Sequence, residues 1–104
     1  MEKIEEKKSC CTARKTHRNS EEKKKLIHRL RRIEGQIRGL CGMVEEDGYC
    51  NDILIQSAAV NAAVNAFNRE LIRMHMKGCV ANDLRAGHDE IIDELTDTLQ
   101  RLMK

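Results

Sequence analysis

The sequence predicts an all-α protein with three helices. Proline and tryptophan are absent from the 104 residues, and Tyr49 and Phe67 are the only aromatic residues, so aliphatic side chains and alanines must supply the packing. This composition suits long helices better than sheets. Apolar residues also recur at helical spacing in three successive segments. A chain of this length forms one small domain with a modest core.

The first helix is predicted over residues 20–47, ending at Gly48. Ser20 is the expected N-cap, and Glu21 and Glu22 follow in the first turn, where the helix dipole favours carboxylates. Apolar residues then recur in a coiled-coil-like seam: they are Leu26, Leu30, Ile33, Ile37, Leu40 and Val44. Three glycines, Gly35, Gly39 and Gly42, share one face of this helix, which indicates close approach by another helix or by the backbone of a ligand.

A second long helix is predicted over residues 49–77, with Asn51 or Asp52 as its cap, because no glycine or proline occurs between Gly48 and Gly78. A short, acidic third helix should follow Asp83 or Gly87. The two long helices are expected to form an antiparallel hairpin whose exposed apolar stripe is buried by a second copy. This gives a dimeric antiparallel four-helix bundle. The alternative is a monomeric three-helix bundle.

Charge divides the chain unevenly. Residues 1–38 carry 13 Lys/Arg and 6 Asp/Glu (+7), whereas residues 39–104 carry 6 and 11 (−5). A basic first half indicates a surface for a polyanion, and the alternative is a solvated, lysine-rich helix face. We expect residues 1–19 to be a flexible basic arm and residues 20–104 to be a single helical domain.

Five cysteines, an odd number, point to free thiols, metal ligands or redox sensing. Since no apolar run reaches the length of a membrane span and no signal peptide opens the chain, a cytoplasmic protein without membrane contact is expected. Cys41 is predicted to be a small buried residue. Cys10 and Cys11, with His17, form either an accessory metal site or an unstructured thiol pair.

The candidate metal ligands are Cys50, His75 and Cys79. His75 and Cys79 are four residues apart and share a helix face. Cys50 begins the same helix, about 37 Å from His75 at 1.5 Å per residue, so it can join them only from an antiparallel second copy. Two thiolates and one imidazole suit Cu(I), or Zn(II) and Ni(II) with a fourth ligand. Alternatively, the three residues are unrelated buried thiols and a surface histidine.

Met74 and Met76 flank His75, and a methionine thioether is a competent Cu(I) ligand. On a helix they point about 100° to either side of the histidine, which favours core packing for both.

Three stretches together resemble the CsoR/RcnR family of bacterial metal-sensing repressors: RLRRIEGQIRGL (29–40), YCNDIL (49–54) and the His75–Cys79 pair. The likeness covers residues 18–103 and is to the copper-sensing branch. It implies Cu(I) held by Cys50 of one protomer and by His75 and Cys79 of its partner. It also implies Tyr49 and a glutamate of the third helix, Glu90 or Glu94, as groups that surround the site.

Other branches of the family remain alternatives. Nickel and cobalt sensors add a histidine just before the first helix, where this chain has Asn19. Persulfide sensors keep the two cysteines and lack the histidine. The resemblance further implies a homotetramer that binds operator DNA without metal and releases it on binding Cu(I), which derepresses genes for copper resistance and efflux. A copper chaperone is a candidate metal donor.

No standard DNA-reading motif is present, so the basic face must bind DNA. The residues to which the resemblance assigns this role are Arg18, Arg29, Arg32, Gln36 and Arg73. Lysine and arginine would contact phosphates, and Gln36 could reach a base edge. A competing class is a thiol protein that buffers metal without binding DNA. An enzyme is not expected, because no oxyanion hole or substrate pocket accompanies the Cys–His pair.

Overall fold

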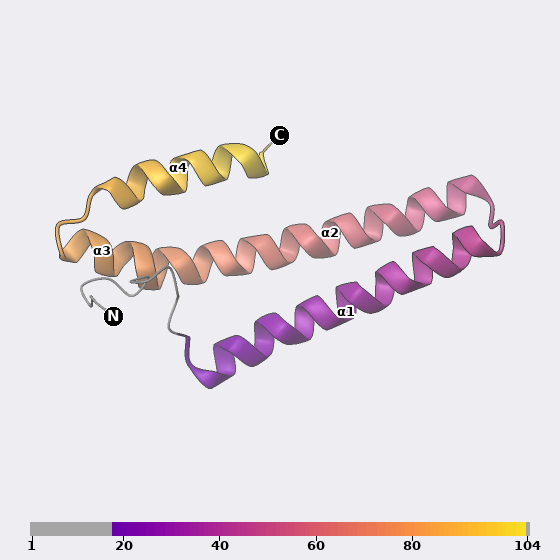
Figure 1. Ribbon diagram of the computed structural model, residues 1–104, viewed down its shortest axis with the longest axis horizontal. Helices are drawn as coiled ribbons and strands as arrows, with labels where there is room; N and C mark the ends of the chain where they lie inside the picture. Colours follow the sequence, from indigo (N-terminus) through magenta and orange to yellow (C-terminus); the bar gives the residue numbers. More distant parts are fainter. Residues whose placement is uncertain (1–17, 104) are drawn as a thin grey trace, which may run out of the picture. The chain divides into compact units, whose positions relative to one another are not determined.

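A computed structural model describes residues 18–103 of the chain, and these residues contain helices and no strand. The all-α prediction is confirmed. The elements are α1 (Ser20–Glu45), α2 (Cys50–His75), η3 (Met76–Val80), α3 (Ala81–Arg85) and α4 (Glu90–Leu102) (Figure 1). Within the described residues, two compact units occur, 18–71 and 72–103. The predicted arm, 1–19, lies outside the described residues except for its last two positions.

The start of α1 differs by one residue from the prediction. Asn19 is the N-cap: its backbone is extended, and its side-chain oxygen accepts a hydrogen bond of 2.8 Å from the backbone N–H of Glu22. Ser20 is the first helical residue, so its prediction as the cap was wrong. Asparagine and serine cap about equally well, and the sequence therefore offered no basis for preferring one.

The turn between α1 and α2 occupies residues 46–49. Asp47 adopts the positive φ of 56° there, whereas Gly48 does not. Gly48 is required for another reason: its N–H donates to the Met43 carbonyl at 2.8 Å, and a Cβ on Gly48 would lie only 3.0 Å from that same oxygen. The glycine thus permits the tight return of the chain after α1.

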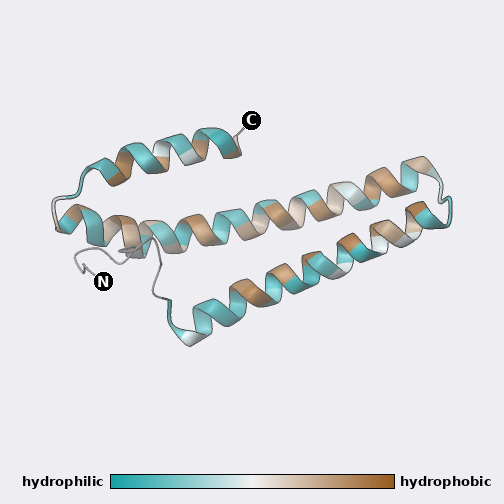
Figure 2. Cartoon of the chain, in the orientation of Figure 1, coloured by the Kyte–Doolittle hydropathy of each residue, from teal (hydrophilic) through white to brown (hydrophobic). Residues whose placement is uncertain are grey.

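Residues 18–71 form the predicted hairpin of α1 and most of α2 (Figure 1). Leu26, Ile33 and Val60 are its buried hydrophobic residues. The rest of the predicted seam on α1 is incompletely covered, since Leu30 is 42% exposed and Ile37 47% exposed. Figure 2 shows how apolar and polar residues alternate along the helices. One chain therefore buries only part of the apolar surface that its periodicity creates.

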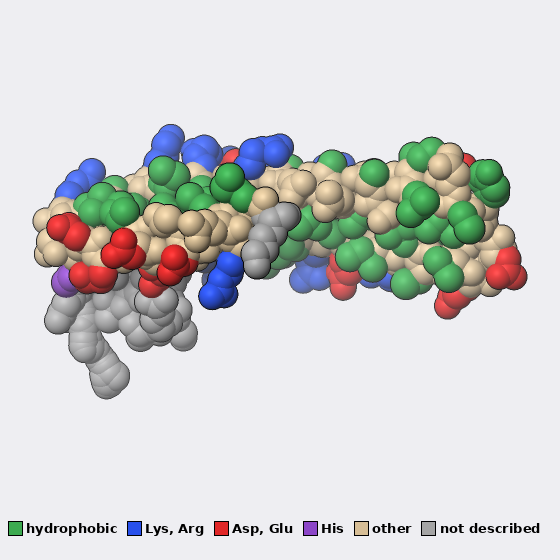
Figure 3. All heavy atoms as spheres, turned by 90° about the horizontal axis from the view of Figure 1, so that it is seen from above, with side chains coloured by type: hydrophobic (Ala, Val, Ile, Leu, Met, Phe, Trp, Pro, Cys, Tyr) green, Lys and Arg blue, Asp and Glu red, His purple; other side chains and the backbone are tan. Residues whose placement is uncertain are grey.

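Apolar exposure extends to the turn end of the hairpin. Large apolar side chains are exposed there (Figure 3), namely Val44, Tyr49, Leu54 and Ile55. A Cβ placed on Gly39 or Gly42 would meet nothing within 4 Å, so neither glycine is approached closely by another part of the described chain. Both observations fit a helix face that remains available to another molecule.

In residues 72–103, the helical path of α2 runs on past the predicted end at Lys77. It continues through a π-helical segment, η3, into α3 and ends at Arg85. Gly87 then adopts a left-handed φ of 84°, and α4 follows from Glu90 with Ile91 buried. Glu90 and Asp93 make the first turn of α4 acidic. No helix within residues 18–103 is long and apolar enough to cross a membrane.

Candidate metal centre and nucleic-acid interface

Cys50 is the first residue of α2, and its thiol is free and exposed. The backbone N–H of Ile53 donates to the Tyr49 carbonyl at 3.1 Å, which begins the hydrogen-bonding pattern of the helix directly before the cysteine. Cys50 therefore sits on a rigid helix end with its sulfur accessible. An exposed sulfur at this position is open to a metal ion or to a second chain.

His75 and Cys79 lie on either side of the transition from α-helix to π-helix. His75 is the last residue of α2 and is half-buried, whereas Cys79, in η3, is only 1% exposed. The backbone N–H of Ala81 bonds to the carbonyl of Met76, five residues earlier, and to that of Gly78. Two residues four positions apart are slightly more than one turn apart on an α-helix. A π-helix has more residues in each turn, so the same two residues are slightly less than one turn apart there.

The three candidate ligands do not come together in one chain. α2 is continuous from Cys50 to His75, which places the two residues about 37 Å apart along its axis. Among the described residues, no group of three or more His, Cys, Asp and Glu side chains could hold a metal ion. A site that contains all three ligands must therefore take them from two copies.

The residues predicted to surround the site are all exposed, and they lie next to Cys50 and in α4. Tyr49 precedes Cys50 and is 72% exposed. Glu90 opens α4, and one of its carboxylate oxygens lies 3.6 Å from Nδ1 of His88. Glu94 follows one turn later, and its carbonyl oxygen accepts a hydrogen bond from the Thr98 hydroxyl. Tyr49, Glu90 and Glu94 thus all lie at the surface of the chain.

Asp83 is a feature that the sequence analysis missed. It is 6% exposed, and its Oδ1 is buried without a hydrogen-bond partner among the described residues. It follows Cys79 by four residues, so both lie on one buried side of the helical segment. A buried carboxylate is rare and expensive unless it is satisfied. The only sequence signal was the unusual position of an aspartate one turn after a candidate ligand.

Two predictions about sulfur-containing residues were wrong. Cys41 is exposed and not buried. Met76 is 50% exposed and so does not pack in a core, whereas Met74 is half-buried. The periodicity of apolar residues does not show which of these positions a neighbouring segment covers.

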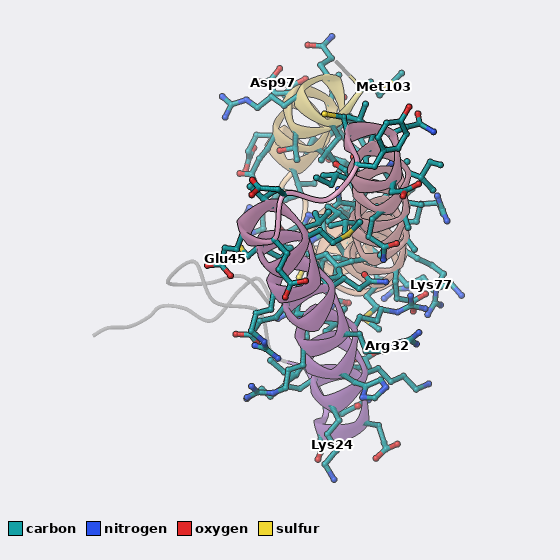
Figure 4. The ribbon with its side chains drawn as sticks, turned by 90° about the vertical axis from the view of Figure 1, so that its right-hand side faces the viewer. Lys24, Arg32, Glu45, Lys77, Asp97 and Met103 are labelled. Atoms are coloured by element: carbon teal, nitrogen blue, oxygen red, sulfur yellow. The ribbon has the colours of Figure 1, made fainter. Side chains whose placement is uncertain are left out.

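The predicted DNA-contacting residues fall on both units. Arg29, Arg32 and Gln36 follow one face of α1 at spacings of three and four residues. Arg29 and Arg32 are exposed, and Arg32 extends away from the helix (Figure 4). Arg73 is exposed near the end of α2, where Lys77 also extends outward.

Two of the predicted DNA-contacting side chains are partly enclosed. Nε of Arg18 and Oε1 of Gln36 are buried and have no hydrogen-bond partner among residues 18–103. The amide of Gln36 must therefore turn outward before its oxygen can reach a base edge. The exposed arginines of α1 need no such change to contact phosphates.

A family model described as the metal-sensitive transcriptional repressor matches residues 22–101, which include both helices of the hairpin and all three candidate ligands. The chain belongs to this family of metal-sensitive transcriptional repressors. The family consists of DNA-binding regulators and not of enzymes, in agreement with the sequence analysis.

Relatives of known function lie within this repressor family. The chain is 44% identical over 89 residues to the copper-sensing transcriptional repressor CsoR of Bacillus subtilis, and the match covers 85% of this chain and 88% of the relative. Among solved structures, it is similar to the Cu(I)-bound copper-sensing repressor CsoR of Geobacillus thermodenitrificans, with a TM-score of 0.82 and 38% identity over 86% of this chain and 95% of the other.

A second structural relative responds to a different metal. The nickel-responsive transcriptional regulator InrS is similar with a TM-score of 0.65 and 35% identity, over 84% of this chain and 96% of the other. The fold is thus shared by transcriptional regulators that respond to different metals, and the ligand residues must decide which metal this chain binds.

Proposed function

We propose that this chain is a Cu(I)-responsive transcriptional repressor that binds operator DNA without metal and releases it when Cu(I) binds. The observation that carries the proposal is the placement of Cys50 at one end of α2 and of His75 and Cys79 at the other. An antiparallel second copy brings Cys50 of one chain to His75 and Cys79 of its partner, and symmetry creates two such sites. Binding of metal is then linked to the geometry of the dimer.

The donor set fits Cu(I). Two thiolates and one imidazole form a soft set of low coordination number, which is the chemistry that Cu(I) prefers. Cys50, His75 and Cys79 would hold the ion, and Tyr49 with Glu90 or Glu94 would orient the imidazole and connect the site to α4. The similarity to the Cu(I)-bound repressor of Geobacillus thermodenitrificans supports this assignment.

Nickel sensing is the main alternative, in view of the similarity to InrS. The position that carries the additional histidine of nickel and cobalt sensors is occupied by Asn19, whose side chain caps α1. Asparagine has no imidazole, so Asn19 cannot provide the nitrogen ligand that nickel and cobalt sensors have at this position. Its side-chain oxygen is already used as the acceptor for the backbone N–H of Glu22. His75 argues against persulfide sensing, and the basic first half argues against a thiol buffer without DNA binding.

The repressor would contact DNA through the basic side chains of α1 and of the end of α2, with Arg29, Arg32 and Arg73 on phosphates and Gln36 near a base edge. Arg18, just before the N-terminus of α1, would be a further contact to DNA. A ligand that shifts a two-state equilibrium from 1:99 to 99:1 must favour one state by about 5.5 kcal/mol. We propose that α2 couples metal binding to the DNA-binding face, because its two ends carry ligands of two different metal sites.

The apolar surface left exposed on α1 and α2 supports a homodimer, and two dimers would form the DNA-binding tetramer. Residues 20–104 would act as one sensing and binding domain, with residues 1–19 as a basic arm. Operator DNA in bacteria lies in the cytoplasm, which is the proposed location, and a copper chaperone would be a suitable metal donor there.

A complementation experiment tests the shared site. Cys50→Ser and Cys79→Ser variants should each lose high-affinity Cu(I) binding, because every site in either homodimer lacks one thiolate. A mixed dimer of the two should regain one complete site, formed by Cys50 of one chain and by His75 and Cys79 of the other. X-ray absorption should show two sulfurs and one nitrogen around copper in the wild type and in the mixed dimer.

The mixed dimer should also release operator DNA on addition of Cu(I), whereas neither homodimer should. A mixed dimer that binds no more Cu(I) than the homodimers would exclude a shared site. A nitrogen-rich shell of four to six ligands in the wild type would point to nickel sensing instead.

A further inference from the structure

Burial of Cys79 raises the question of how metal reaches it. Only 1% of the surface of this residue is exposed, and Val80 beside it is 5% exposed. His75 is half-buried. The other half of the proposed site offers the exposed thiol of Cys50. In the half that carries His75 and Cys79, a Cu(I) ion delivered from outside meets a more accessible soft donor before it meets the buried sulfur of Cys79.

Met76 provides such a donor. It is 50% exposed, although a large apolar side chain gains free energy from burial, and it lies one residue after His75 and three before Cys79. Its thioether is a soft ligand on a flexible side chain with three rotatable bonds, and soft sulfur ligands favour Cu(I). Met76 is also the first residue of η3, whose backbone departs from α-helical hydrogen bonding.

We infer that Met76 is the entry ligand for the half of the site that carries His75 and Cys79: its thioether takes Cu(I) from the donor and passes it to the imidazole of His75 and the thiol of Cys79. The inference rests on the proposed function. The transfer is a ligand exchange in which copper stays Cu(I), the Met76 sulfur leaves, and the thiol proton of Cys79 is released to water as the Cu–S bond forms. Met76 is absent from the final set of two sulfurs and one nitrogen.

The first test is kinetic. Cu(I) is supplied as its complex with bicinchoninate, and loss of the visible absorption of that complex follows transfer to the reduced full-length protein. Met76→Leu keeps an apolar side chain of similar volume and removes the sulfur. It should load about tenfold more slowly than the wild type, equivalent to about 1.4 kcal/mol in the barrier, while the equilibrium affinity for Cu(I) stays unchanged.

Met103→Leu is the matched control, because Met103 is 83% exposed and lies after the last residue of α4. It should load at the wild-type rate. If Met76 only packs against a second copy, Met76→Leu will also load at the wild-type rate, and the inference is then wrong. A large fall in equilibrium affinity would also contradict it, since Met76 would then belong to the final site.

The second test observes the thioether directly. In a Cys79→Ser variant in which Cys10, Cys11 and Cys41 are also replaced by serine, with ¹³C-labelled methionine methyl groups, the final site is incomplete and no thiol outside the site competes for metal. Ag(I) serves as a spectroscopically silent substitute for Cu(I). Ag(I) should shift the methyl signal of Met76 and leave that of Met103 in place. An unshifted Met76 signal would overturn the inference.

The role of Met76 and the Cu(I) ligand set are tested by different measurements. X-ray absorption of the wild-type Cu(I) protein tests the set of Cys50, His75 and Cys79 without reference to Met76. A shell of two sulfurs and one nitrogen, together with equal loading rates in wild type and Met76→Leu, would remove the entry ligand and leave the proposed function intact.

Discussion

Replacement of Gly78 by alanine should stabilise the protein. Gly78 lies in the middle of η3, its φ is outside the left-handed region, and a Cβ built on it would meet nothing within 4 Å. Alanine is favoured over glycine in a helix interior by about 1 kcal/mol, because glycine loses more backbone freedom on folding. Since the added methyl group neither clashes nor strains the backbone, most of that difference should appear in the free energy of unfolding.

Gly87 provides the matched control for the same substitution. A Cβ there also meets nothing within 4 Å, so the two sites do not differ in available space. Gly87, however, has a φ of 84°, and an L-residue in the left-handed region is disfavoured by about 1–2 kcal/mol. Gly87→Ala should therefore destabilise the protein, and the two variants should differ by about 2–3 kcal/mol in opposite directions from wild type.

Thermal unfolding of the metal-free protein at a fixed concentration measures both effects. For a chain of this size, 1 kcal/mol corresponds to a change in Tm of about 4–8 °C. We expect Gly78→Ala above wild type and Gly87→Ala below it. A lower Tm for Gly78→Ala would refute the reasoning, because it would mean that the π-helical segment depends on the glycine for a conformation or contact that alanine cannot provide.

The same variant tests the role of η3 in DNA release. If the segment between His75 and Cys79 must change its backbone when metal binds, a stiffer residue at position 78 should alter the Cu(I) concentration at which DNA is released. Affinity for Cu(I) itself should stay near normal, since the three ligands are unchanged. Titration of an operator complex with Cu(I) measures this effect, and an unchanged release curve would count against such a role.

Two further predictions concern α1. Asn19→Ala should lower the free energy of unfolding by about 1 kcal/mol, because the N–H of Glu22 loses its side-chain acceptor at 2.8 Å. Asn19→Ser should keep most of the wild-type stability, since serine is also a good cap. Chemical denaturation measures both variants. Arg29→Ala should weaken operator binding almost equally for all DNA sequences and reduce the slope of log affinity against log salt by about 1 in binding assays at several salt concentrations. An unchanged slope would mean that Arg29 contacts no phosphate, and Arg101→Ala, in α4, is the control.

The periodicity of apolar residues was sufficient to predict the helices but not their ends. The spacing of Leu26, Ile33 and their neighbours predicted α1 within two residues at its C-terminus. The cap was missed by one residue because Asn19 and Ser20 are both good caps, and only the hydrogen bond to Glu22 distinguishes them. The run from α2 into α3 was also missed, since Gly78 weakens a helix without necessarily ending it.

Burial was harder to predict than secondary structure. A helical wheel identifies an apolar stripe, but it does not show how much of that stripe a neighbouring helix covers. Leu26 is buried while Ile37 is 47% exposed, although both belong to the same seam. Cys41 and Met76 were misplaced for the same reason.

The all-α fold, the hairpin and the rule that Cys50 cannot meet His75 and Cys79 in one chain could all be predicted from the order of residues. These conclusions follow from spacing along a regular helix, whose rise and period are set by the backbone. The three-dimensional structure was needed to show that Cys79 lies in a π-helical segment that begins directly after His75, that Cys79 and Asp83 are buried, and that Met76 is exposed. Those properties depend on which backbone hydrogen bonds form and on which neighbouring atoms exclude water, and neither is encoded in the spacing of residues along one helix.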